Sequence, residues 1–181
     1  MKKIFCLIVF LFSQLFWGQS FYLKIKGKNE PAGLLKELNY VVKHKNVKIL
    51  IDEANGVLNE IQRKGFLESK MAHPVRENDS TFLVEIDFGK QTNFIHIYIG
   101  NENRSLIDAK LPEITLPFVD SEGFMNESLK KLESRGFSLA KMKLESIEIK
   151  NDTLFSELVI DLEKKRVLNA IVVNGMDKFP I

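Results

Sequence analysis

Apolar and polar residues alternate along some stretches of the chain and recur at helical spacing along others. Residues 21–27 alternate, with apolar Phe21, Leu23 and Ile25 separated by polar positions, which predicts a half-buried strand. Pro31 can then open a helix at its first turn. One face of that predicted helix carries Leu34, Leu35, Leu38, Val41 and Val42.

A second helix and two further strands complete this pattern. The apolar stripe of the helix is Ala54, Val57, Leu58 and Ile61. Asp52 is the expected N-cap, and Gly65 is the expected end, because glycine enters the left-handed region at little cost. The weak strand over 68–75 contains Pro74, which places it at a sheet edge. A strong strand follows over 81–88, so the predicted order is strand, helix, helix, strand, strand.

The chain repeats itself at a period of about 70 residues. Residues 61–71 read Ile-Gln-Arg-Lys-Gly-Phe-Leu-Glu-Ser-Lys-Met, and residues 132–142 read Leu-Glu-Ser-Arg-Gly-Phe-Ser-Leu-Ala-Lys-Met. The segment 78–87 resembles 151–161 in the same way. Short apolar strands also end at Gly27, Gly100 and Gly175. Three elements that recur in one order predict a tandem duplication.

The second unit departs from the first between its first strand, 94–100, and its clear helix. Pro112 and Pro117 interrupt residues 101–120, where we expect a short helix near 104–109 or only a loop. Met125, Leu129 and Leu132 line the next helix, which should end at Gly136. Strand 139–150 changes its apolar parity, which predicts a bulge near Glu145–Ser146, and strand 153–162 pairs back.

The chain therefore divides into four predicted segments. These are a leader over 1–20, unit one over 21–91, unit two over 92–166, and the first strand of an incomplete third unit over 167–181. Since a lone strand at 168–175 has no helix or hairpin of its own to pack on, we expect the N-terminal part of a longer protein or a truncated gene product.

The first twenty residues have the pattern of a bacterial secretory signal. Lys2 and Lys3 precede an unbroken apolar run over 4–12, and small Gly18 and Ser20 favour cleavage after Ser20. An uncleaved N-terminal anchor is the alternative. Cleavage would place the mature protein in the periplasm.

Composition narrows the function classes. The chain has 181 residues, 45% hydrophobic and 28% charged, which is typical of a folded protein. Its net charge of +2 comes from Lys2 and Lys3, so the remainder is neutral, which disfavours a nucleic-acid partner. The only cysteine is Cys6, and His44, His73 and His96 lack partners at metal-ligand or triad spacing. No nucleophile-elbow, zinc-helix or phosphate-loop motif occurs, so we expect no enzyme activity, catalytic residue, metal or cofactor.

In its tandem β-α-α-β-β units behind a signal peptide, the chain resembles the POTRA (polypeptide-transport-associated) family over residues 21–175. Ile171-Val-Val-Asn-Gly175 is similar to the family's first strand, Leu132-Glu-Ser-Arg-Gly-Phe137 to the end of its second helix, and 147–160 to its last hairpin. The resemblance implies an α+β fold with a three-stranded mixed sheet and helices on one face in each unit. The proline-interrupted stretch 101–120 departs from the family pattern.

The resemblance also implies a function. Tandem POTRA domains usually precede an outer-membrane β-barrel of the BamA and TamA type, hang in the periplasm, and bind unfolded outer-membrane polypeptides and accessory proteins. Such a barrel would need far more chain than is present here. Two alternatives remain, namely a free-standing periplasmic adaptor and a POTRA-like module of another secretion or division apparatus.

The expected binding site is an open sheet edge, because unpaired main-chain groups accept an extended peptide of any sequence. If the family topology holds, the edge strand is 139–150 in unit two and 68–75 in unit one, and the longer, proline-free strand is favoured. The candidate binding residues are Leu139, Lys141, Lys143, Glu145, Glu148, Ser69, Met71 and His73. The charges would tune partner choice, or they would only keep a bare edge soluble.

Overall fold

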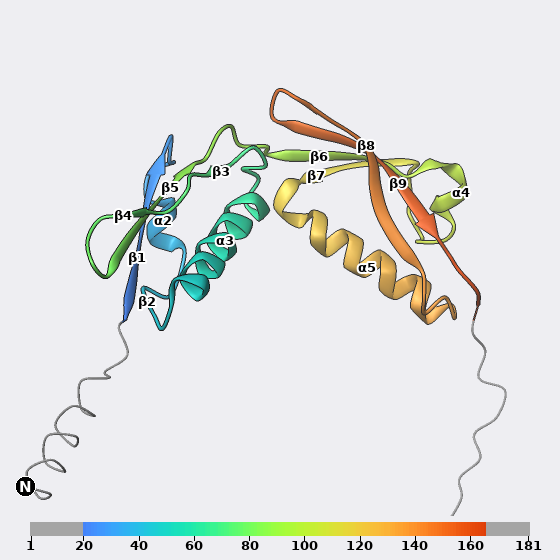
Figure 1. Cartoon of the computed structure of the whole chain (residues 1–181). Coiled ribbons are helices and arrows are strands. Elements are labelled where there is room, and N and C mark those ends of the chain that lie inside the picture. Colours follow the sequence, from blue (N-terminus) through green and yellow to red (C-terminus); the bar gives the residue numbers. More distant parts are fainter. Residues whose placement is uncertain (1–19, 166–181) are drawn as a thin grey trace, which may run out of the picture. The chain divides into compact units, whose positions relative to one another are not determined.

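The computed structural model describes residues 20–165, which form two compact units divided between Gln91 and Thr92 (Figure 1). The leader, apart from Ser20, and the strand predicted over 168–175 lie outside the described residues. Within residues 20–165, no helix has both the length and the apolar character that a membrane span needs.

Unit 1, which ends at Gln91, is a mixed sheet with helices. Its elements are β1 (Phe21–Lys28), α2 (Leu34–Glu37), β2 (Lys43–His44), α3 (Val47–Arg63), β3 (Lys70–Met71), β4 (Val75–Arg76) and β5 (Thr81–Asp87). The strand order is β2-β1-β5-β3, and β4 also pairs with β5. β1 and β5 run parallel, and the other pairs are antiparallel.

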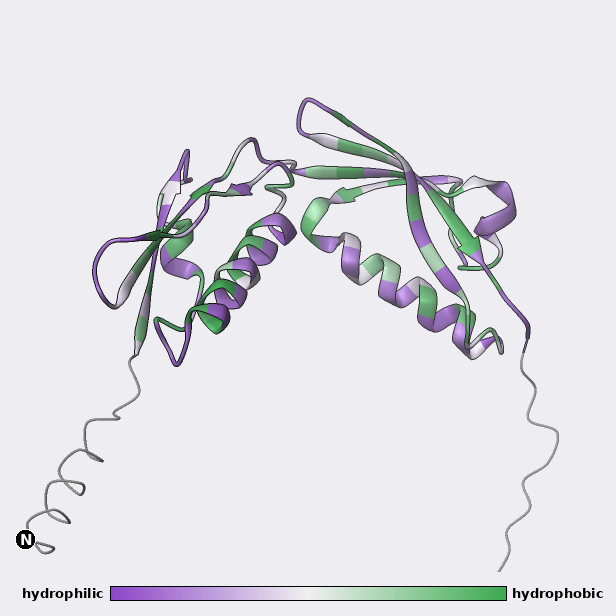
Figure 2. Ribbon diagram, in the orientation of Figure 1, coloured by the Kyte–Doolittle hydropathy of each residue, from purple (hydrophilic) through white to green (hydrophobic). Residues whose placement is uncertain are grey.

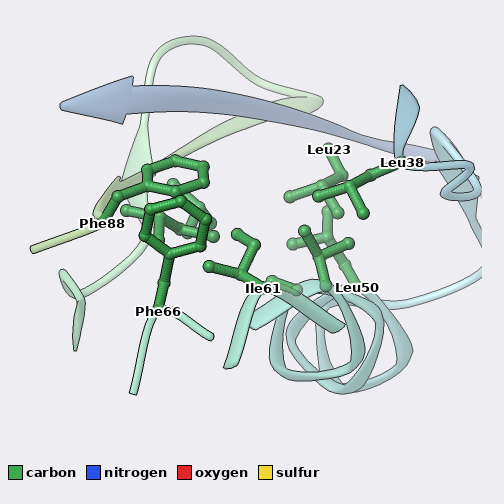
Figure 3. Close-up of a cluster of buried hydrophobic side chains, with 10 residues drawn as sticks. Leu23, Leu38, Leu50, Ile61, Phe66 and Phe88 are labelled. Carbon is green, nitrogen blue, oxygen red and sulfur yellow. The ribbon is translucent and has the colours of Figure 1, made fainter. Parts of the chain in front are cut away.

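The core of unit 1 lies between α3 and the central strands, as Figure 3 shows. Leu50 and Ile61 of α3 are fully buried against Leu23 of β1. Phe66 and Phe88 close the core with an edge-on ring contact, with centroids 5.4 Å apart. The stripe predicted from sequence is therefore the buried face of this helix, and Figure 2 shows the hydrophilic residues on its other side.

Two local predictions in unit 1 are wrong. α3 begins at Val47, and its N-cap is Asn46, whose side chain accepts a hydrogen bond from Ile49 N (2.9 Å); Asp52 lies inside the helix. The first helix is only the four residues of α2, because the chain turns into the extended segment that forms β2. Val41 and Val42 are consequently exposed rather than on a buried helical face.

Unit 2, which starts at Thr92, repeats the arrangement with longer outer strands. Its elements are β6 (Phe94–Tyr98), α4 (Gly100–Arg104), β7 (Glu113–Pro117), the 3-10 turn η1 (Phe118–Asp120), α5 (Ser121–Ser134), β8 (Lys141–Lys150) and β9 (Thr153–Asp161). The strand order is β7-β6-β9-β8. Buried Ile95, Ile97 and Leu132 belong to its core.

The α+β class with mixed sheets is confirmed, and both sheets are wider than predicted. A short strand, β2 or β7, pairs with the far side of the first strand of each unit. β7 lies where we expected only a short helix or a loop, and α4 ends at Arg104, where that helix was expected to start. The helices α3 and α5 end as expected, since Gly65 (φ 97°) and Gly136 (φ 94°) adopt the left-handed conformation.

Candidate functional site

β8 forms one edge of the unit 2 sheet and is ten residues long. The hydrogen bonding of its neighbour β9 shows which β8 groups are free. Phe94 N donates to the carbonyl of Asp152 (3.1 Å), and Phe94 is in register with Thr153 of the parallel strand β9. Since bonding alternates sides along a strand, Thr153 and every second residue after it direct their main-chain groups toward β8.

The free main-chain groups of β8 follow from this alternation. Its residues in register with that set are Lys141, Lys143, Glu145, Glu148 and Lys150. Their main-chain groups are therefore used in bonds to β9. The N–H and C=O groups of Met142, Leu144 and Ile149 point the other way, into the open edge.

The charged candidates on β8 contribute side chains rather than main-chain groups to this edge. The four are Lys141, Lys143, Glu145 and Glu148, and all are exposed. Their side chains lie on the opposite face of the strand from half-buried Met142 and Leu144. Lys143 Nζ lies 2.5 Å from Glu145 Oε1, and Lys141 Nζ lies 3.2 Å from Glu163 Oε1. The hydrogen bond that Lys143 donates to Glu145 and the attraction of the Glu145 charge raise the pKa of Lys143.

The predicted bulge in β8 is confirmed. The register with β9 shifts between Glu145 and Glu148, and Ser146 has a φ of 53°. Ser146 and exposed Ile147 together oppose one residue of β9, so the strand bends there. The free edge is therefore divided into one stretch before the bulge and one after it. Leu139 lies just before β8 and is 44% exposed.

The edge of unit 1 is short and broken. Met71 belongs to β3 and is half-buried, exposed His73 lies between β3 and β4, and Pro74 next to it has no N–H to offer. Ser69 precedes β3 and is only 5% exposed, with its Oγ lacking a hydrogen-bond partner. The structure thus brings Met71 and His73 to an edge but leaves Ser69 inside.

β7 is a second open edge of unit 2, which the sequence prediction missed. It lies on the far side of β6 from β9 and pairs with β6 alone among the described strands. Its sequence, Glu-Ile-Thr-Leu-Pro, alternates polar and apolar residues between two prolines. That alternation was the signal for a strand, and the prolines were the signal for an edge.

The three histidines have different local surroundings. His44 is buried, with Nε2 2.7 Å from the carbonyl oxygen of Val41. His96 Nδ1 lies 2.8 Å from Thr115 Oγ1 on the outer face of the unit 2 sheet. Within residues 20–165, no group of three or more His, Cys, Asp or Glu residues is placed to hold a metal ion. The chemistry available at the two edges of unit 2 is main-chain hydrogen bonding with flanking side chains.

Comparison by sequence finds no matching family profile and no matching curated protein. Comparison by structure finds the crystal structure of Haemophilus influenzae BamA POTRA3-5, with a TM-score of 0.51 at 18% sequence identity. The match covers 81% of this chain and 68% of that chain. At this identity the likeness concerns the fold, and the chain has a POTRA-like fold.

Proposed function

We propose that the protein is a non-enzymatic, polypeptide-binding module of the POTRA type, with units over 21–91 and 92–166 and a third beginning at 167–181. It works in the periplasm, behind a cleaved signal peptide, as part of an outer-membrane assembly or translocation factor of the BamA or TamA type. Its partners are unfolded outer-membrane polypeptides and accessory periplasmic proteins. A free-standing adaptor, or a module of another secretion or division apparatus, would use the same edge.

The observation that carries this proposal is the open edge of β8. Met142 and Leu144 offer two outward N–H and two outward C=O groups before the bulge, and Ile149 offers one pair after it. An extended segment that pairs with these groups adds a fifth strand to the four-stranded sheet. Main-chain pairing needs no particular client sequence, which suits a binder of many polypeptides.

The charges on β8 set the specificity of such a site only weakly. Lys143 with Glu145, and Lys150 with Glu148 (2.8 Å), form pairs along the strand on the exposed face. These pairs leave little net charge beside the edge, so neither acidic nor basic clients are rejected.

The test uses a defined unstructured peptide, acetyl-Lys-Thr-Val-Thr-Leu-Thr-Val-Thr-Lys-amide, titrated into the ¹⁵N-labelled full-length protein. Binding at β8 should shift the amide signals of Met142, Leu144 and Ile149 to saturation. Met142→Pro removes one outward donor and should weaken binding by about tenfold, whereas Met142→Ala loses the same side chain and keeps the N–H. Unchanged signals at β8 on saturation, or equal effects of the two variants, would overturn strand addition at β8.

A further inference from the structure

We infer that β7 is a second polypeptide-binding edge, which takes an extended segment with apolar side chains at every second position. This inference rests on the proposed function for the class of partner. It assigns that partner to a different strand, which forms the opposite edge of the sheet from β8. It depends on the main-chain geometry of β7 and on the shape of the surface beside it.

Two hydrogen bonds fix which main-chain groups of β7 are free. Ile99 N donates to the carbonyl of Pro112 (2.7 Å), and Phe118 N donates to the carbonyl of Asn93 (2.8 Å). The pair Ile99–Pro112 lies just beyond one end of the β6–β7 ladder, and the pair Asn93–Phe118 lies just beyond the other. Bonded pairs alternate along an antiparallel ladder, so the even-numbered residues of β7 face β6 and the odd-numbered residues face outward.

The outward groups form a short, well-defined docking edge. Glu113 and Thr115 each offer an N–H and a C=O, and both residues are exposed. Pro117 offers only a C=O, and its missing N–H is at an outward position, so no bond to β6 is lost. An antiparallel segment centred opposite Ile114 can therefore exchange four main-chain hydrogen bonds with Glu113 and Thr115.

The surface beside this edge of the sheet has two hollows. One hollow, of about 270 Å³, has an apolar wall of Ile114 of β7 with Ile99, Ile107, Leu111 and Phe124, and charged residues, among them Lys110 and Lys131, also line it. A second, of about 400 Å³, is lined by Leu116, Val119, Gly123 and Phe124, with the carboxylates of Asp120 and Glu127 also in its wall. We call these two hollows together the β7 groove.

The hollows and the main-chain edge fit one kind of occupant. Ile114 and Leu116 are two residues apart, so their side chains share a face, and each lines one hollow. In an added strand, the residues opposite these two would direct their side chains into the same hollows. Leu111 and Val119 are 66% and 60% exposed and would be covered by such side chains. The occupant is therefore an extended segment that is apolar toward the helix and polar toward solvent.

Lys131 of α5 and Arg135 at the C-cap of that helix hold the wall of the first hollow in place. Lys131 Nζ donates to the carbonyl of Ile107 (3.0 Å). Arg135 donates to the carbonyls of Ser105 (2.6 Å) and Leu106 (2.7 Å) and pairs with Asp108 Oδ1 (2.6 Å). A wall fixed before binding needs less ordering when a segment arrives, which favours affinity.

The test applies the same nine-residue peptide to the full-length protein and follows both edges in one titration. Binding at β7 should shift the amide of Glu113 and the methyl groups of Ile114 and Leu116 to saturation. Thr115→Pro removes the second outward donor and should weaken this binding by about tenfold. Thr115→Val is the matched control, because it loses the hydroxyl contact with His96 and keeps the N–H; it should bind within about twofold of the parent.

A second variant tests the hollow without changing the strand. Ala109 lines the first hollow, and Ala109→Phe should fill it. This change should weaken binding at β7 by about tenfold and leave the shifts at Met142 and Leu144 unchanged. It keeps the inference testable if Thr115→Pro disturbs the sheet.

The outcomes separate this inference from the proposed function. Saturable shifts at β7 that Thr115→Pro and Ala109→Phe weaken, and Thr115→Val does not, would support it. Shifts confined to β8 would overturn the β7 site and leave the proposed function standing. Shifts at neither edge would overturn both. Equal losses in Thr115→Pro and Thr115→Val would overturn main-chain pairing at β7.

Discussion

Replacing Arg135 with methionine should destabilise unit 2 and loosen the wall of the β7 groove. The guanidinium group makes two hydrogen bonds to main-chain carbonyls, of Ser105 and Leu106, and one ion pair with Asp108. These contacts hold a segment 27 to 30 residues distant in sequence against the end of α5. Methionine keeps much of the aliphatic stem, so the variant chiefly removes the polar contacts.

The magnitude follows from the exposure of the groups. A hydrogen bond donated by a charged group contributes about 1.5–3 kcal/mol, but the Arg135 side chain is 37% exposed, so about 1 kcal/mol for each carbonyl bond is appropriate. Asp108 is 61% exposed, and an ion pair at such a site contributes about 0.5 kcal/mol. The expected loss is therefore about 2.5 kcal/mol.

Urea denaturation of the full-length protein measures this loss unit by unit. Methyl NMR signals of Ile95 and Ile97 report unit 2, and those of Val84 and Ile86 report unit 1. With an m-value of about 1–3 kcal/mol/M, the unit 2 midpoint should fall by roughly 0.8–2.5 M, and the unit 1 midpoint should stay unchanged.

Asp108→Asn is the control, because it removes the charge of the ion pair and leaves both carbonyl bonds in place. It should cost about 0.5 kcal/mol. If Arg135→Met costs no more than Asp108→Asn, the carbonyl bonds contribute nothing to stability. The reasoning about the wall of the groove would then be refuted.

Three further changes test local backbone and charge. Ser146→Gly should stabilise unit 2 by about 0.5–1 kcal/mol in urea denaturation, because φ is 53° there; a loss of stability would contradict the bulge geometry. Gly136→Ala should destabilise it by about 1–2 kcal/mol in the same assay, since φ is 94°. The hydrogen bond from Asn29 Nδ2 (2.9 Å) lowers the pKa of Asp87. Asn29→Gly keeps the left-handed backbone and should raise that pKa toward its ordinary value in an NMR titration. Asp87 stabilises the fold at pH values above its unfolded pKa, and this stabilisation is lost as the pH falls through its lowered folded pKa. In Asn29→Gly this contribution to stability should be smaller.

Side-chain periodicity was sufficient where one face of an element is buried. The stripe of α3 from Ala54 to Ile61 could be predicted because each residue on the buried face of the helix is apolar, whatever its neighbours are. The bulge at Ser146 could be predicted in the same way. An extra residue in a strand shifts the apolar positions from odd to even numbers or the reverse, and that change is visible in the sequence. The cap at Asn46 was missed because Asn46 and Asp52 both have side chains that can cap a helix. Choosing between them requires knowing where the helix begins, which the apolar stripe does not show.

The edges of the sheets were harder to predict, for a physical reason. Periodicity reports which face of a strand is buried, but hydrogen bonds lie at right angles to that direction, in the plane of the sheet. Glu113 and Thr115 look like ordinary solvent-facing residues in the sequence, yet their main-chain groups form the free side of β7. The pattern of side chains therefore predicts which faces of the unit 2 strands are buried, but it does not predict that β7 forms a second edge of the sheet.

Proline is the one residue whose side chain carries information about the edge itself. Because proline lacks an N–H, a sheet tolerates it where that group would point to solvent. Pro74 lies beside the broken edge of unit 1, and Pro117 occupies an outward position of β7. Pro74 was interpreted in this way, whereas Pro117 was interpreted only as a helix breaker. Its outward position also limits β7 to two donors, so a segment that binds there must gain affinity from the two hollows. β8 has three outward donors, but its bulge leaves two on one side and one on the other.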